Sequence, residues 1–367
     1  MPNQNKPIKS VQKMLLIYTI RIFFGLLLLL IFVVGIFLLY LNIQDFNPAS
    51  HETLKPAAHA YQRQVPAKFR LISWNIGYGG LGKSMDFFYD GGQRVRAGKE
   101  QSEEWLHGIT AWIAQQADTD FLLLQEVDFD AKRTYRKNQL AQIAPVLPNH
   151  EYVSAINYQV PFVPVPLREP MGAVKAGMLS FSAYQSLAAT RHAYPQIAGW
   201  PDRMFLLDRC FIESRFATTD NKELVILNTH NSAFIDDAMK MNHELKRIQE
   251  KMLLEYSLGN YVIAGGDWNM NPPAYVPETH FGGHRFVPSA VAFPQDFFPA
   301  GWTFAFDAKT PSNRFLDEAY NKGITGSTTL DYFILSPNIK LEKMETIDLN
   351  FKNSDHNPVV MEVSLQH

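Results

Sequence analysis

A carboxylate and a carboxamide stand two residues apart where a short apolar run of the chain ends. Residues 261–272 have the sequence Y-V-I-A-G-G-D-W-N-M-N-P, in which Asp267 and Asn269 follow two glycines. An apolar run of this length that stops at turn residues predicts a buried strand, and side chains two apart along it point to the same side. Ionised Asp267 only accepts hydrogen bonds, whereas Asn269 also donates them. The pair is therefore a candidate for chemistry, although an isolated G-D-x-N is equally typical of an Asx turn.

Five further apolar runs carry polar groups of the same kind at one end. They are Leu71–Asn75, Asp120–Glu126, Leu224–His230, Tyr332–Leu335 with Asp331 before it, and Val359–Val363 with N-S-D-H-N-P before it. Any one such end could be solvated surface. Six of them, which together present carboxylates, amides and histidines, predict one shared site. The residues presented are Asn75, Glu126, Asn228, His230, Asp267, Asn269, Asp331, Asp355 and His356.

In this order the segments resemble the endonuclease/exonuclease/phosphatase superfamily, the DNase I-like metal-dependent phosphoesterases, over about residues 68–366. The motifs are S-W-N at 73–75, Q-E at 125–126, N-T-H at 228–230, G-D-W-N at 266–269 and S-D-H-N-P at 354–358. Each is unspecific alone, and the ordered set is specific. The resemblance implies an α/β fold, a four-layer sandwich of two packed mixed β-sheets flanked by helices.

The resemblance also assigns roles to the residues. It implies metal binding by Asn75, Glu126 and Asp355, substrate binding by Asn228, and catalysis by His230, Asp267, Asn269, Asp331 and His356. In the family pattern Asp331 orients His356, while Asp267 and Asn269 orient the attacking water and the phosphate. The family's usual basic residue is missing from Gly177–Ser182, and Trp268 replaces the more common phenylalanine. These departures remove no catalytic group, but they leave the substrate class open.

The donor atoms and the histidines indicate which chemistry to expect. Carboxylate and amide oxygens suit a hard cation, so we expect Mg²⁺, with Mn²⁺ as the alternative, rather than zinc. His356 either caps a strand or meets the scissile phosphate, and a carboxylate on one ring nitrogen would fix its tautomer. His230 is either the second active-site histidine or a satisfied core histidine. The predicted reaction is in-line attack of water on a phosphoester.

Composition and net charge limit the classes of substrate that we expect. The chain has 367 residues, 46% hydrophobic and 19% charged, and a net charge of −2. Lys6, Lys9, Lys13 and Arg21 precede the first acidic residue, and without these four cations the remainder has a net charge of −6. An acidic domain grips duplex phosphates poorly, so we expect a lipid or small-molecule phosphoester as substrate and disfavour nucleic acid. An anchored nuclease and a non-catalytic binding module with the same fold remain alternatives.

The N-terminal region predicts membrane attachment. Residues 23–41 form an apolar run interrupted only by glycines, long enough as a helix to cross a hydrocarbon layer about 30 Å thick. No small-x-small cleavage site follows, which favours a retained signal anchor over residues 23–43. The preceding cations place residues 1–22 in the cytoplasm, so the protein is expected to be a single-pass cell-membrane protein with its catalytic domain extracytoplasmic. Three prolines in residues 44–66 suggest a linker, with the catalytic domain at 67–367.

Two stretches have the periodicity of core-facing helices, and three resemble loops. Apolar residues recur at helical spacing over 105–113 and 241–252. The segments 77–99, 157–172 and 272–329 are rich in glycine, proline or aromatic residues and are expected to be loops that either determine specificity or only cover the surface. Their aromatic side chains could line a pocket, face a lipid surface or be buried. They are Phe87, Phe88, Tyr89, Phe162, Phe281, Phe297 and Phe298.

Overall fold

The computed structural model describes residues 6–366 except 59, 197, 234–237 and 276–291. The chain forms two compact units, residues 1–45 and residues 46–367. The first unit contains the helix α1 (Lys6–Ile43). Its stretch Val11–Ile43 contains an 18-residue window with a mean hydropathy of 3.3 and is long and apolar enough to cross a membrane.

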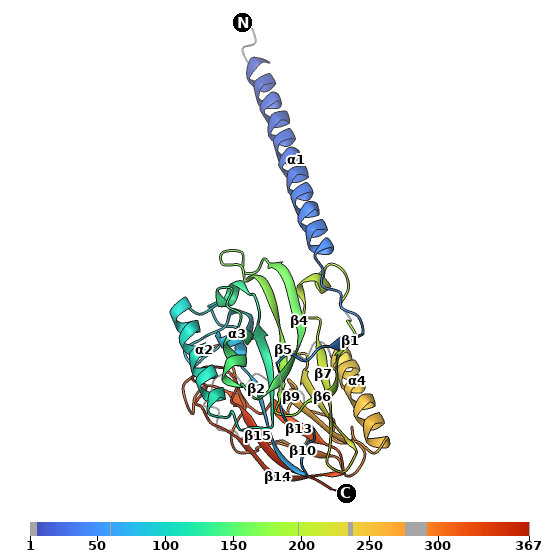
Figure 1. The fold of residues 1–367 in the computed structure, drawn as a ribbon. Coiled ribbons are helices and arrows are strands. Elements are labelled where there is room, and N and C mark those ends of the chain that lie inside the picture. Colours follow the sequence, from blue (N-terminus) through green and yellow to red (C-terminus); the bar gives the residue numbers. More distant parts are fainter. Residues whose placement is uncertain (1–5, 59, 197, 234–237, 276–291, 367) are drawn as a thin grey trace. The chain divides into compact units, whose positions relative to one another are not determined.

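The second unit contains two large mixed sheets (Figure 1). The first has the order β1 (His51–Leu54), β6 (Ser186–Ala193), β7 (Cys210–Ala217), β8 (Glu223–His230), β9 (Tyr261–Asp267), β13 (Asp331–Leu335), β10 (Thr303–Ala305). The second has the order β14 (Ile339–Thr346), β15 (Val359–Leu365), β2 (Lys68–Asn75), β3 (Phe121–Asp128), β5 (Gly172–Ser182), β4 (Glu151–Val163). The pairs β8–β9 and β2–β3 are parallel, and the other pairs are antiparallel.

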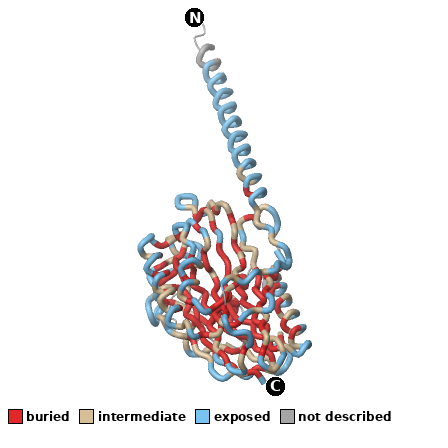
Figure 2. Tube along the Cα trace, in the orientation of Figure 1, coloured by how far each residue is buried: buried red, intermediate tan, exposed pale blue. Residues whose placement is uncertain are grey.

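Successive apolar side chains along a strand point to opposite faces of the sheet, so each sheet has buried residues on both faces. In β2, Leu71 packs between the sheets with Ile263 and Phe333, whereas its neighbour Ile72 packs on the outer face against Ile109 of α2 (Lys99–Ala114). The helix α4 (Ala238–Ser257) covers the outer face of the other sheet through Leu245, Ile248 and Met252. The buried residues therefore concentrate in the centre of the domain (Figure 2). The predicted four-layer α/β sandwich is confirmed, and so are the apolar faces of both helices, except at Met241, whose side chain lies outside the described residues.

The segment predicted as a linker, residues 44–66, packs on the domain instead. Its strand β1 pairs antiparallel with β6, Ala57 bridges to Tyr152, and Val65 is fully buried between the sheets. The compact unit accordingly begins at Phe46 rather than at 67. Pro48, Pro56 and Pro66 lie outside β1 and outside the bridging residues, so they do not prevent the segment from packing on the domain.

All three predicted loops contain short elements of regular structure. The β4 strand continues to Val163, and the segment 272–329 holds the short strands β10, β11 (Asn313–Arg314) and β12 (Ser327–Thr328). Among the loop aromatics, Phe87 and Phe298 are buried and Phe297 packs beside Phe298, while Phe281 lies outside the described residues. The segment 77–99 contains the short 3₁₀ helices η1 (Gly77–Gly79) and η2 (Phe88–Asp90). Shorter helices complete the fold: η3 (Lys132–Thr134), α3 (Leu140–Ile143), η4 (Ala144–Val146) and η5 (Asp202–Phe205).

Candidate active site

Strand direction brings the predicted polar ends to one edge of the sandwich. The parallel strands β8 and β9 end side by side, with His230 opposite Asp267 in the register. Because β13 runs antiparallel to β9, its first residue, Asp331, also lies opposite Asp267. The second sheet supplies Asn75 at the end of β2 and Glu126 near the end of the parallel strand β3. Parallel pairing thus explains why strand ends far apart in sequence meet.

A β-bulge turns Glu126 toward the site. The pairing of β3 with β5 shifts register between Leu124 and Val127, and Glu126 has a φ of 52°. A left-handed backbone is costly for a residue with a side chain, and such strain concentrates at functional sites. The surrounding strands hold Glu126 in this conformation, so that its carboxylate leaves the sheet.

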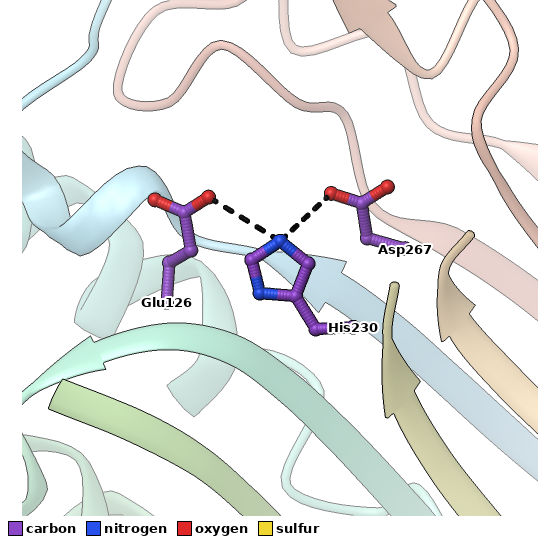
Figure 3. A group of neighbouring side chains, drawn as sticks. All are labelled: Glu126, His230 and Asp267. Carbon is purple, nitrogen blue, oxygen red and sulfur yellow. Dashed lines mark ion pairs between the residues drawn. The ribbon is translucent and has the colours of Figure 1, made fainter. Parts of the chain in front are cut away.

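Glu126, His230 and Asp267 face one another (Figure 3). The His230 Nε2 atom lies 3.7 Å from Glu126 Oε1 and 3.6 Å from Asp267 Oδ2. The Asn75 amide nitrogen donates to the same two carboxylate oxygens, at 3.1 Å and 2.9 Å, and its oxygen accepts from the Gly77 N–H at 3.0 Å. Asn75 therefore fixes the two carboxylates relative to each other.

His356 is held by a buried carboxylate. Its Nδ1 lies 2.7 Å from Asp331 Oδ2, which also accepts from the Ser312 hydroxyl at 2.7 Å. Its Nε2 points toward the cluster, 3.7 Å from Asp267 Oδ2 and 3.9 Å from Asp355 Oδ2. Burial disfavours the charged ring, but the three carboxylates outweigh it and raise the pKa of His356 well above its ordinary value.

His230 is in the opposite protonation state. Burial, together with the nearby Arg209 and His356, holds its pKa well below the ordinary value, so the ring is neutral. Its Nδ1 is buried and has no hydrogen-bond partner among the described residues. The site thus combines a cationic and a neutral histidine, a pairing that suits two different roles in one reaction.

The carboxylates form a cluster with excess negative charge. Burial is the main cause that raises the pKa of Asp267 to about 6 and that of Asp355 to about 7, with further contributions from Asp331 on Asp267 and from Glu126 on Asp355. Among the described residues, the ligand atoms of Glu126, His230 and Asp267 lie within 4.8 Å of one another. Two carboxylates in a cluster whose negative charge exceeds its positive charge are suitable ligands for a hard divalent cation.

The predicted residues divide into those that reach the cavity beside this cluster and those behind it. The cavity, of about 890 Å³, is lined by Glu126, His230, Asp267, Asn269, Asp355 and His356. Asp331 and Asn75 are fully buried and act through their neighbours. Asn269 forms the Asx turn with Asp267, since its N–H donates to Asp267 Oδ1 at 2.9 Å.

Asn228, predicted to bind substrate, lies between the sheets instead. Its oxygen accepts from Gln125 Nε2 at 2.7 Å, and its nitrogen donates to the Leu179 carbonyl at 2.9 Å. It is fully buried and does not line the cavity. The polar strand end N-T-H therefore contains one residue between the sheets and one that lines the cavity, which the motif alone does not distinguish.

Several cavity residues carry no clear signal in the sequence. Asn313 contacts His356 Nε2 at 2.9 Å, and Arg133 pairs with Asp128 while its guanidinium lies 3.5 Å from the centre of the Tyr78 ring. Arg314 donates to the carbonyls of Leu81, Gly82 and Met85. Arg209 donates to the carbonyls of His230 and Asn231 at 3.2 Å and 2.6 Å. The side chains of these arginines hydrogen-bond to other residues of the cavity wall. These contacts could be identified only from the tertiary structure.

Comparison with known proteins agrees with this geometry. The chain is similar in structure to an endonuclease/exonuclease/phosphatase from Bacteroides vulgatus, with 14% identity, a TM-score of 0.51 and coverage of 82% of this chain and 99% of that one. It is also similar to the human Nocturnin catalytic domain solved with bound sulfate, with 16% identity, a TM-score of 0.50 and coverage of 85% and 97%. At these identities the likeness shows the fold alone.

No curated protein matches the sequence. The family model described as Endonuclease/Exonuclease/phosphatase family matches residues 72–356, a span that includes every site residue named above. Members of this superfamily are generally metal-dependent hydrolases of phosphoesters. The chain belongs to the endonuclease/exonuclease/phosphatase family.

Proposed function

We propose that this protein is a membrane-anchored, Mg²⁺-dependent phosphoester hydrolase that acts outside the cytoplasm on a lipid head group or a small phosphoester. The observation that carries the proposal is the cluster of Glu126, His230, Asp267 and His356 on one cavity whose remaining lining is largely apolar. The family relationship supports phosphoester hydrolysis.

The metal site would be built around Glu126 and Asp267, which Asn75 holds together. Mg²⁺ bound there would neutralise charge that develops on the phosphate, and Mn²⁺ offers the same chemistry. Asp355 adds a third carboxylate at the edge of the cluster. The amide of Asn75 presents its nitrogen to the carboxylates, so we assign Asn75 to positioning rather than to direct coordination.

The side chains supply the remaining steps. Asp267 lies within 3.7 Å of both histidines, so a water held by its carboxylate is directed at a phosphate between them. The water oxygen forms a bond to phosphorus as its proton passes to the Asp267 carboxylate. The opposite ester bond breaks in line, and the leaving oxygen takes up a proton and departs as the alcohol. His356, held charged by Asp331, stabilises the equatorial oxygens or protonates the leaving alcohol, while neutral His230 donates a hydrogen bond through Nε2.

Charge and the N-terminal helix support the substrate class. The helix α1 is long enough to span a membrane, and the cations before it favour an extracytoplasmic domain. The remaining net charge of −6 disfavours duplex DNA, because a polyanion would have to be held by local contacts alone.

A substrate panel tests this proposal with the full-length protein in lipid nanodiscs. It contains phospholipid vesicles, para-nitrophenyl phosphate, bis(para-nitrophenyl) phosphate and supercoiled plasmid, each assayed with Mg²⁺, Mn²⁺ and Ca²⁺. We expect the lipid or a small ester to be hydrolysed faster than the plasmid is nicked, and Glu126→Gln to abolish turnover. Efficient nicking at physiological salt, without turnover of the other substrates, would replace the proposal with the nuclease alternative.

A further inference from the structure

One side of the cavity is a continuous apolar surface. Its residues belong to a single hydrophobic cluster although they come from five separate segments of the chain. We call this surface the apolar arm and define it by the cavity-lining residues Phe87, Val163, Met171, Phe205, Leu207 and Leu316. None of them is needed for attack on a phosphate.

The rim of the apolar arm is apolar and open to solvent. Tyr89, Val165 and Leu206 line the same cavity, and their exposed fractions are 37%, 45% and 39%. The Tyr89 hydroxyl donates to the Val165 carbonyl at 2.6 Å, which ties η2 to the connection between β4 and β5. Exposed apolar side chains that gather at a cavity mark a ligand site, because their burial by a ligand is favourable.

The wall of the same cavity contains a residue with a buried amide donor. A register shift between Ile156 and Tyr158 in the β4–β5 pairing makes the consecutive residues Asn157 and Tyr158 both line the cavity. Asn157 is only 3% exposed, and its Nδ2 has no hydrogen-bond partner among the described residues. A buried donor without a partner is unfavourable unless a ligand supplies an acceptor.

We propose that the apolar arm binds the hydrocarbon or aryl part of an amphiphilic phosphoester and that Asn157 donates to an ester, ether or hydroxyl oxygen on that part. The proposal rests on the proposed function for the phosphate end and adds the chemistry of the other end. Under this proposal Leu206 and Val165 determine which hydrocarbon length of the ligand is preferred. Asn157 determines whether a ligand with an oxygen atom in that part is preferred. The amphiphile can reach the arm either from a bilayer or as a free monomer.

Binding of alkylphosphonates tests the arm without requiring turnover. Affinity of the full-length protein in nanodiscs for methyl-, butyl- and hexylphosphonate is measured by calorimetry with Mg²⁺ present. We expect affinity to rise by about two- to fourfold per buried methylene. Leu206→Asp should flatten this dependence, whereas Leu187→Asp, which changes an exposed leucine that does not line the cavity, should leave it intact.

The role of Asn157 is tested with a second pair of ligands. Hexylphosphonate is compared with an alkoxyethylphosphonate of equal chain length, which adds one ether oxygen. In Asn157→Leu we expect the ether compound to lose about three- to tenfold in affinity relative to hexylphosphonate. An unchanged ratio between the two ligands would remove Asn157 from the subsite.

The outcomes separate this inference from the proposed function. Affinity that is independent of chain length would overturn the apolar arm even if phosphoesters are hydrolysed. Chain-length dependence without any turnover would support the arm and contradict the proposed function. Comparison of dihexyl phosphodiester monomers with the same head group in vesicles then shows whether the amphiphile arrives free or from the bilayer.

Discussion

The contact between Asp331 and His356 predicts that these two residues act as a unit. Asp331 Oδ2 lies 2.7 Å from His356 Nδ1 and is the largest of the favourable influences on the charged ring. Asp331→Asn keeps the shape and one acceptor oxygen but removes the negative charge. The variant should therefore retain the fold and lose the cationic state of His356.

The expected size follows from the distance between the charges. Removal of a unit charge about 4 Å away is worth about 4 kcal/mol at an effective dielectric constant of 20. At 1.36 kcal/mol per factor of ten in rate, the loss of this interaction in the transition state corresponds to about a thousandfold. We expect kcat at neutral pH to fall by up to that factor, and the double variant with His356→Ala to be no worse than His356→Ala alone.

The assay is a double-mutant cycle on kcat for the best phosphoester of the panel. Circular dichroism and thermal unfolding confirm that each variant is folded. Asp307→Asn is the control, because the Asp307 carboxylate accepts three backbone hydrogen bonds but lies outside the cavity. Losses that multiply in the double variant would show that Asp331 and His356 act independently and would refute the pairing.

Three further results are expected. Glu126→Gln should abolish the rise in thermal stability on Mg²⁺ addition as well as turnover, and a normal Mg²⁺ response would exclude Glu126 from the metal site. A cysteine at Tyr61, which is 78% exposed, should react with an impermeant maleimide in intact cells, since the one native cysteine, Cys210, is buried; labelling only after lysis would reverse the topology. Burial alone would raise the pKa of Glu213, but hydrogen bonds from His192, Arg215 and Lys251 outweigh it and lower the pKa to about 2 from its ordinary 4.5. The ionised Glu213 carboxylate therefore stabilises the fold fully above pH 4.5, and this stabilisation is lost as the pH falls toward 2. Glu213→Gln should therefore destabilise the domain by about 3 kcal/mol at pH 7, and by progressively less below pH 4.5, when thermal unfolding is compared across pH; an equal loss at about pH 3 would contradict this.

The sandwich and most of the site could be predicted from the sequence, the sandwich through the family resemblance and the meeting of polar strand ends through local patterns. Apolar runs predict strands, and parallel pairing then brings their polar ends together at one edge. Asp267, His230 and His356 could thus be predicted to meet, and they do.

Other features depend on tertiary contacts that leave no local trace. Asn228 and His230 belong to one motif, yet only the position of the second sheet decides that Asn228 bonds to Gln125 and His230 faces the cavity. The strand β1 lies in a proline-containing segment, and its pairing depends on the free edge of β6. The bulge that places Asn157 in the cavity wall is likewise set by register and not by composition.

Hydrolysis in ¹⁸O-labelled water tests the central proposal most directly. The full-length protein is stripped of metal, supplied with Mg²⁺ and given its best phosphoester under single-turnover conditions. We predict one ¹⁸O atom in the phosphate product, none in the alcohol, and no product before Mg²⁺ is added. Label in the alcohol, or the same turnover with and without a divalent cation, would contradict metal-assisted attack of water on phosphorus.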